Sequence, residues 1–285
     1  MIVHYGAFVM LPVDSHVHSE WSWDAPNASM ENACARAVEL GLPAIAFTEH
    51  LDHTSLNIGS ADDAHLLSLS SPEGVLSPPA FDVDGYLDSI ERCRERFPGL
   101  RILSGLEVGE PHWHAEAVAK VLAAGRFDRI LGSLHCLPDG DGFAEPWGLY
   151  DHRLAAEVIR EYLAEVAGLA AGSDVFSVLA HIDYPVRSWP TEAGPFDPPA
   201  FEEEFRHALR ATASSGRALE INTRLPLSPV ILRWWHEEGG PAVSFGSDAH
   251  DPSLVAHRFR EAADMAEAHG FRPGQDPYDF WARVD

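Results

Sequence analysis

The sequence predicts an α/β fold whose parallel strands close into a barrel, and two observations support this prediction. Apolar segments suited to strands alternate with amphipathic segments suited to helices about seven times, without antiparallel hairpin signals. Six of the apolar runs end in His, Glu or Asp, and parallel strands gather their carboxyl ends on one face. With 285 residues, of which 46% are hydrophobic, we expect one domain that covers residues 1–285.

The predicted elements follow one another in a regular order. An apolar, β-prone segment at 7–13 predicts the first strand. The stretch from Met30 to Leu40 predicts a helix, with Ser29 as its N-cap and Gly41 just after its last turn. Further strands are expected at 42–47, 100–103, 127–131, 175–180, 217–221 and 242–245. Helices are expected at 82–97, 111–124, 153–171, 201–214, 229–238 and 254–269.

Two irregular segments interrupt this order. Residues 51–80 are rich in Ser, Asp, Pro and His, and we expect a lid or rim over the strand ends. We expect His53 and His65, which lie in this segment, to be solvated. Residues 136–150 contain Asp-Gly-Asp-Gly, which predicts a turn because the full calcium-loop pattern is missing. The tail at 276–283 is expected to add a short helix.

The composition argues against several classes of function. Twenty Lys and Arg against 44 Asp and Glu leave a net charge of −24, which repels nucleic acid and anionic lipid. No apolar run reaches the length of a membrane span, and the first residues lack a signal-peptide pattern. Cys34, Cys93 and Cys136 are odd in number and far apart, which favours reduced thiols in the cytoplasm. The oligomeric state is left open.

The polar strand ends predict a metal site. His16 and His18 are two residues apart, so in a strand both side chains point the same way and can share one ion. One His-x-His pair is weak support, but the theme recurs across the chain. Buried polar groups are costly unless they are paired or ligated, so a purely structural role for all of them is a poor explanation. The recurring ends are Glu49-His50, Glu107, His135, His181-Ile182-Asp183 and Asp248-Ala249-His250.

Three other residues near these ends have two interpretations each. His112 and His114 fall in the first turn of the predicted 111–124 helix, so we expect them on its surface. A substrate contact is the alternative, because Glu107 is close in sequence. Cys136, next to His135, is expected to be a small filler residue, with an approach to the metals as the alternative.

Taken together, these motifs resemble the polymerase and histidinol phosphatase (PHP) family over nearly the whole chain and in the family's order. The chain's length is similar to that of the histidinol-phosphate phosphatase branch, which Glu220-Ile221-Asn222-Thr223 also resembles. The resemblance implies a distorted (β/α)7 barrel with two to three divalent ions at the carboxyl ends of its strands. Histidine and carboxylate ligands suit zinc, iron or manganese.

The resemblance also implies which residues hold each ion. The first ion would take His16, His18, Glu107 and Asp248. The second would take Glu107, His135 and His181, with the Glu107 carboxylate bridging the two ions. The third would take Asp24, His50 and His250, although many relatives have His where this chain has Asp24, which still supplies a hard anionic ligand. Catalytic roles are implied for Glu107, Asp248, His250 and Glu49.

A phosphate ester also needs contacts beyond the metals. Arg187 and Arg224 each follow a strand that ends at the same face, and guanidinium groups suit phosphate oxygens. We expect both arginines, together with Asn222, to bind substrate; surface salt bridges are the alternative for the arginines. Glu49 has three interpretations: a contact to the substrate's ammonium group, a partner that orients a ligand histidine, or an exposed acid.

The function that follows is hydrolysis of a small phosphate monoester, L-histidinol phosphate, by a metal-activated water. No nucleophile elbow, P-loop or dinucleotide fingerprint is present. One alternative is a phosphatase or phosphodiesterase/exonuclease of the same family that acts on nucleotides or other small phosphoesters. The charge and the lack of a basic stripe disfavour polynucleotides. The other alternative is a metal-binding regulatory module without turnover.

Overall fold

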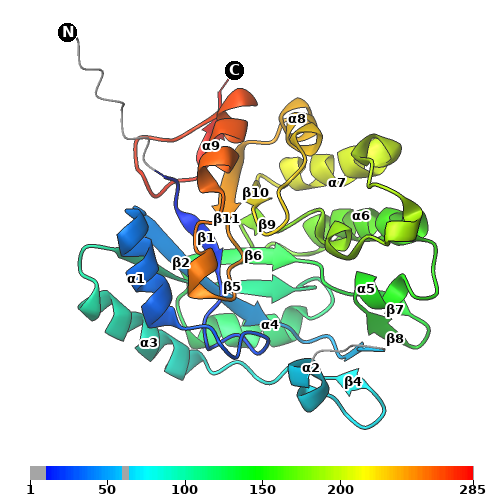
Figure 1. The fold of residues 1–285 in the computed structure, drawn as a ribbon, viewed down its shortest axis with the longest axis horizontal. Coiled ribbons are helices and arrows are strands. Elements are labelled where there is room, and N and C mark those ends of the chain that lie inside the picture. Colours follow the sequence, from blue (N-terminus) through cyan, green and yellow to red (C-terminus); the bar gives the residue numbers. More distant parts are fainter. Residues whose placement is uncertain (1–10, 60–63, 285) are drawn as a thin grey trace.

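The structure is a computed structural model, and it describes residues 11–59 and 64–284. Its main sheet has nine strands, and seven of them run parallel as consecutive neighbours (Figure 1). In sheet order these seven are β1 (Asp14–Val17), β2 (Ala44–Leu51), β5 (Arg101–Gly109), β6 (Arg129–Ser133), β9 (Val178–Leu179), β10 (Ala218–Asn222) and β11 (Ala242–Gly246).

The first and last of the parallel strands meet and close the sheet. Val17 of β1 forms a parallel bridge with Ala249, just beyond β11. The amide of Asp248 donates to the carbonyl of His16 at 2.7 Å, and the amide of His18 donates to the carbonyl of Ala249 at 2.9 Å. The predicted distorted (β/α)7 barrel is therefore confirmed, and its first and last strands lie side by side.

The helices cover the outside of this barrel (Figure 1). Helix α1 begins after Ser29, whose hydroxyl accepts from the amide of Asn32, and ends at Gly41, whose φ of 68° is left-handed. Helices α1 and α3 share one apolar cluster with β2, and α6 to α9 share a larger one with β9 to β11. The helices are α1 (Met30–Leu40), α2 (Ala64–Leu69), α3 (Val83–Arg96), α4 (Ala115–Ala124), α5 (Pro146–Leu149), α6 (Ala155–Gly172), α7 (Glu202–Ser214), α8 (Pro229–Glu237) and α9 (Phe259–Ala268).

The structure contains antiparallel strand pairs, for which the sequence showed no signal. The tail forms β13 (Trp281–Arg283) instead of a short helix, and it pairs antiparallel with β11 and with β12 (Phe271–Arg272). The indole of Trp281 is buried against Phe245, with ring centroids 4.9 Å apart, and this packing holds the tail extended. Two small two-stranded sheets add antiparallel pairs: β3 (Leu56–Asn57) with β4 (Val75–Leu76), which α2 separates in sequence, and the hairpin of β7 (Leu137–Asp139) and β8 (Gly142–Ala144).

Two predicted helices start later than expected. Helix α4 begins at Ala115, not Pro111, because the preceding turn directs the side chains of His112 and Trp113 onto Glu165 of α6. Helix α9 begins at Phe259, because Ala256 and Arg258 have left-handed φ values of 53° and 57°. Most of the strand predicted at 7–13 lies outside the described residues.

Candidate metal centre

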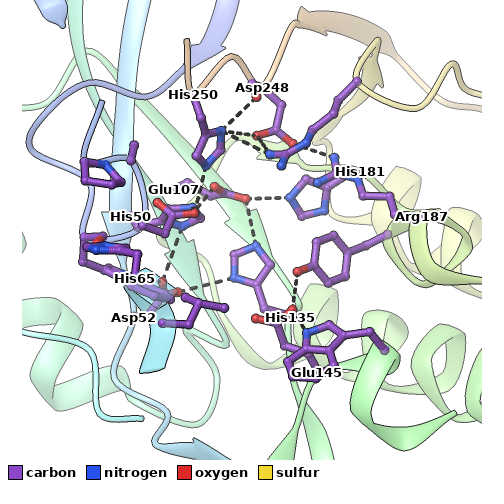
Figure 2. Close-up of a pocket in the computed structure, with 18 of the residues that line it drawn as sticks. His50, Asp52, His65, Glu107, His135, Glu145, His181, Arg187, Asp248 and His250 are labelled. Atoms are coloured by element: carbon purple, nitrogen blue, oxygen red, sulfur yellow. Dashed lines mark hydrogen bonds and ion pairs between the residues drawn. The ribbon is translucent and has the colours of Figure 1, made fainter. Parts of the chain in front are cut away.

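The candidate site lies at the carboxyl ends of the parallel strands, where the residues predicted as metal ligands meet (Figure 2). His16, His50 and Glu107 lie within β1, β2 and β5. The others come just beyond a strand, where the chain leaves the sheet and its side chains can turn inward. His18 follows β1, His135 follows β6, His181 follows β9, and Asp248 and His250 follow β11.

The Glu107 carboxylate lies between two groups of histidines, one at each oxygen. Oε2 is 3.1 Å from Nε2 of His16 and 3.3 Å from Nε2 of His18. Oε1 is 3.1 Å from Nε2 of His135 and 2.6 Å from Nε2 of His181. One carboxylate that offers a different oxygen to each group has the arrangement needed to bridge two ions.

Asp248 completes the first of these groups. Its Oδ1 lies 3.5 Å from Nε2 of His18 and 3.9 Å from Nε2 of His16, and these two nitrogens are 3.0 Å apart. The backbone of Asp248 has a φ of 53°, which is strained for a residue with a side chain and is typical of functional sites. Its carboxylate is thereby held among the histidines.

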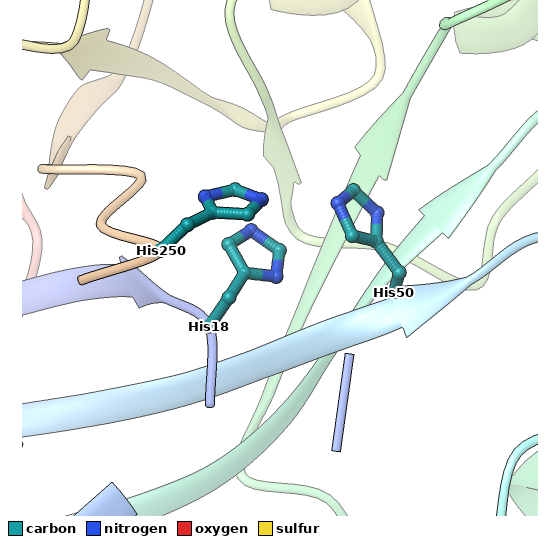
Figure 3. Close-up of side chains that lie close together, drawn as sticks. All are labelled: His18, His50 and His250. Carbon is teal, nitrogen blue, oxygen red and sulfur yellow. The ribbon is translucent and has the colours of Figure 1, made fainter. Parts of the chain in front are cut away.

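The third group lies next to the first. Nε2 of His250 is 2.9 Å, and Nε2 of His50 is 3.3 Å, from Oδ2 of Asp24. The His18 ring lies 4.3 Å from the His50 ring and 4.2 Å from the His250 ring, so three imidazoles crowd together (Figure 3). The other carboxylate oxygen of Asp24 is buried and has no hydrogen-bond partner within the described part of the chain.

These residues fit divalent metal ions chemically. Burial raises the pKa of Glu107, but nearby histidines outweigh that effect and hold the pKa well below its usual range. Burial also raises the pKa of Asp248, but Arg187 and His16 hold it well below the usual value, so both carboxylates are anionic. Burial, followed by repulsion from His250 and His50, lowers the pKa of His18 to about 4, which leaves a neutral imidazole with a free lone pair. At His16, His50 and His135 burial lowers the pKa, but neighbouring carboxylates outweigh it and raise the pKa, so a metal ion would displace protons from these rings. Anionic oxygens and neutral imidazole nitrogens are the donors that zinc, iron and manganese take.

Both predicted arginines reach the cavity beside these groups. The cavity has a volume of about 610 Å³. An Nη atom of Arg187 donates to Oδ2 of Asp248 at 2.5 Å, and an Nη atom of Arg224 lies 3.4 Å from Oδ1 of the same carboxylate. Arg224 also lies 3.1 Å from Nδ1 of His250. Each guanidinium therefore stands at the edge of the metal-ligand cluster.

Two predicted site residues lie behind this cluster and do not line the cavity. Glu49 is buried and accepts hydrogen bonds from the Ser19 hydroxyl at 2.6 Å and the Ser22 hydroxyl at 2.6 Å. The Ser22 hydroxyl in turn lies 2.9 Å from Nδ1 of His18, so Glu49 reaches a histidine of the cluster through a serine. Asn222 is also buried; it donates to Glu220 at 3.0 Å and accepts from the amide of Arg224.

Three histidines and one cysteine near the cluster were also predicted from the sequence. His65 was expected in solvent, which is wrong: it lines the cavity, and its Nε2 lies 2.7 Å from the Trp23 carbonyl. Neither His112 nor His114 is a surface residue of a first helical turn, because Nε2 of His112 is 2.7 Å from Glu165 and Nε2 of His114 is 2.9 Å from the Thr54 hydroxyl. Cys136 packs in a small apolar cluster as a filler, as expected.

Sequence reasoning missed three carboxylates that border the cluster. Glu220 appeared only within a motif, yet its Oε1 lies 2.6 Å from Nδ1 of His16 and its Oε2 accepts from the amide of His181. Asp52 lies 3.4 Å from Nδ1 of both His50 and His135. Glu145 lines the cavity from the segment predicted as irregular. Two of them had a weak signal in the sequence: Asp52 stands two residues after His50, just past the end of β2, and Glu220 lies in the Glu220-Ile221-Asn222-Thr223 motif.

A closed α/β barrel with grouped histidines and carboxylates at its strand ends, beside a cavity that carries arginines, defines a barrel-type metallohydrolase. The chain belongs to the PHP family: the PHP domain matches residues 14–224. Within the described residues, the helices are too short or too polar to cross a bilayer.

Known proteins similar to this chain are histidinol phosphatases. A probable histidinol-phosphatase of Deinococcus radiodurans is 32% identical, over 87% of this chain and 90% of that protein. The histidinol-phosphatase of Lactococcus lactis is 26% identical, over 91% of this chain and 93% of that protein. The crystal structure of the Lactococcus lactis histidinol phosphate phosphatase, complexed with zinc, L-histidinol and phosphate, superposes with a TM-score of 0.77 at 23% identity. That match covers 92% of this chain and 94% of that one, which supports the same fold.

Proposed function

We propose that this protein hydrolyses L-histidinol phosphate to L-histidinol and inorganic phosphate, with two to three divalent ions of zinc, iron or manganese. The observation that carries the proposal is the Glu107 carboxylate, which presents one oxygen to His16 and His18 and the other to His135 and His181. The 32% and 26% identity to histidinol phosphatases supports this substrate.

The residues are proposed to hold the ions in three sets. Glu107 belongs to two of them and therefore fixes their spacing. When bound, the ions lower the pKa of water and neutralise phosphate charge, which are the main requirements of phosphate monoester hydrolysis. The sets are His16, His18, Glu107 and Asp248; Glu107, His135 and His181; and Asp24, His50 and His250.

The other residues bind the substrate or support the ligands. Arg187 and Arg224 are proposed to donate to the phosphate oxygens, because both guanidinium groups stand at the cavity beside the ligand cluster. Glu49 is proposed to orient His18 through Ser22, and so to act as a positioning residue. Asn222 is proposed to position Arg224, to whose amide it is hydrogen-bonded, without touching substrate itself.

We also propose that residues 1–285 form one domain and that the enzyme is cytoplasmic. The nine-stranded sheet includes strands from Asp14 to Arg283, which supports a single unit. All three cysteines are free thiols, as is usual in a reducing compartment.

A phosphate-release assay tests the proposed function. The protein, reconstituted separately with zinc, manganese or iron(II), is given L-histidinol phosphate, a nucleoside monophosphate and a sugar phosphate, from which inorganic phosphate is measured. It is also given single-stranded DNA, from which released nucleotides are measured. We expect L-histidinol phosphate to have the highest kcat/KM. Faster cleavage of DNA or of a nucleotide would favour the alternative family activity, and no turnover of any substrate would favour a regulatory module.

A further inference from the structure

The cavity has two chemically different ends (Figure 2). Arg187, Asp248 and His250 lie together at one end, where the ligand cluster is. Glu145 lies at the opposite end, beyond His135. A ligand that spans the cavity would therefore meet guanidinium groups at one end and a carboxylate at the other.

Hydrogen bonds hold the Glu145 carboxylate in place through one of its oxygens. Oε2 accepts from the hydroxyl of Tyr184 at 2.7 Å and from the indole N–H of Trp147 at 2.9 Å. Both donors are neutral, and within the described residues no cationic side chain lies in ion-pair distance of this carboxylate. Glu145 therefore presents to the cavity wall a carboxylate that, within the described residues, no cationic side chain pairs with directly.

Burial makes this arrangement costly without a ligand. It raises the pKa of Glu145, while His135 and the hydrogen bond from Tyr184 lower it. A half-buried carboxylate without a paired cation loses hydration, and the two neutral hydrogen bonds to Oε2 replace only part of it. A cationic ligand nitrogen would restore it, and the adjacent aromatic rings of Trp147 and Trp23 offer faces that also attract cations.

Tyr184 connects this carboxylate to the proposed metal ligands at the other end of the cavity. Its ring centroid lies 5.0 Å from that of His181 and 5.1 Å from that of His135, and its hydroxyl reaches Glu145. One tyrosine side chain therefore bridges the proposed metal ligands and the carboxylate. A small molecule can span the same separation.

We propose that Glu145 is a specificity-determining residue that binds a cationic nitrogen of the substrate while Arg187 and Arg224 bind its phosphate. This inference rests on the proposed function, since L-histidinol phosphate carries a phosphate at one end and an ammonium and an imidazole at the other. The same arrangement rejects phosphate esters that lack a cation, because they leave the Glu145 charge unpaired.

The Glu145→Gln variant tests this proposal. The glutamine oxygen can still accept from Tyr184 and Trp147, so the variant removes the charge and keeps the local hydrogen bonds. We expect kcat/KM for L-histidinol phosphate to fall about 10- to 100-fold, the usual effect of a lost charge-assisted contact. For phenyl phosphate, which has no cationic nitrogen, we expect kcat/KM to stay the same or to rise, because the variant removes the charge that this substrate leaves unpaired. Metal content should equal that of the wild type.

A matched control is Glu165→Gln, which removes a carboxylate that also accepts from a tryptophan N–H, that of Trp113, but does not line the cavity. The Glu165→Gln variant should leave kcat/KM unchanged for both substrates. An equal loss for both substrates in Glu145→Gln, or no loss for either, would overturn the proposal.

Calorimetric binding of L-histidinol separates this inference from the proposed function. Weaker binding to Glu145→Gln than to the wild type supports the role of Glu145 whatever the turnover. Equal affinity, or no binding even to the wild type, overturns it. A wild type that binds L-histidinol but does not hydrolyse its phosphate contradicts the proposed function alone.

Discussion

The carboxylate of Glu220 lies 2.6 Å from Nδ1 of His16, and both side chains are fully buried. An anionic Glu220 accepts a hydrogen bond from Nδ1–H of His16, so that Nε2 of this ring faces Glu107 and His18. The fit is so close that a Cβ on Gly246 would collide with this carboxylate. Glu220 therefore sets the tautomer of His16 and occupies the space that the glycine leaves open.

Glu220→Gln is expected to weaken metal binding. A glutamine has one accepting oxygen, so it satisfies either His16 or the amide of His181, but not both. Loss of such a supporting carboxylate costs about 10- to 100-fold in metal affinity. Competition with a metallochromic chelator measures this affinity. Glu91→Gln, on an exposed helix face, is the control, and equal affinities in the two variants would show that His16 is oriented by something else.

Glu107→Gln is expected to lose at least one ion and several orders of magnitude in turnover. The substitution replaces one of the two oxygens that face the two histidine groups with an amide nitrogen, and it removes the negative charge between them. Elemental analysis and steady-state kinetics measure the two effects. His112→Gln and His114→Gln should have much smaller effects, because neither side chain lines the cavity. A Glu107→Gln enzyme with full metal content would place the bridge elsewhere.

Arg187→Ala and Arg224→Ala are expected to raise KM for L-histidinol phosphate about 10- to 100-fold each, through loss of a charge-assisted contact to phosphate. Metal content is expected to remain. Arg187→Lys is the informative comparison, since it keeps the charge but loses the planar guanidinium that reaches Asp248. Unchanged kinetics in both alanine variants would reduce the arginines to salt-bridge partners of Asp248.

Removal of metal is expected to lower the melting temperature. An ion that binds only the folded state stabilises it by about 2.7 kcal/mol for each site when the free ion concentration is 100 times the Kd of that site. Differential scanning fluorimetry before and after treatment with a chelator measures this shift, and zinc, manganese or iron(II) should reverse it. Asp24→Ala should lower the metal count by one, because this carboxylate joins His50 and His250. The same count as in the wild type would show that Asp24 is not needed to hold an ion, and a wild-type count of two would argue against a third ion.

The strand ends were predictable because two local signals coincide there. An apolar run followed within a few residues by His or a carboxylate is readable without knowledge of any distant residue, as at His135 and Asp248. The parallel order of the strands then brings all such ends to one face. This is why the proposed ligands could be identified from sequence and are found close together.

Glu220 and Glu145 could not be recognised in this way. Glu220 lies within a strand, and its partner His16 is 204 positions away, so only the folded barrel brings the two together. Glu145 stands in a segment without periodicity and depends on Tyr184, which comes from beyond β9. The antiparallel tail was also missed, since Trp281 packs on Phe245 only after the barrel has formed.

The pairing of β1 with the end of β11 has a consequence for folding during translation. His16 and His18 are made first, whereas Asp248 and His250, just beyond the strand beside them, follow 232 residues later in the sequence. At ordinary rates of elongation this interval is on the order of 10 to 50 seconds. Throughout it, the nascent chain exposes an incomplete pair of histidines next to an unpaired strand edge. The proposed ligand set is complete only after Asp248 and His250 have been made, so an ion that binds it must do so after translation of the strands between them.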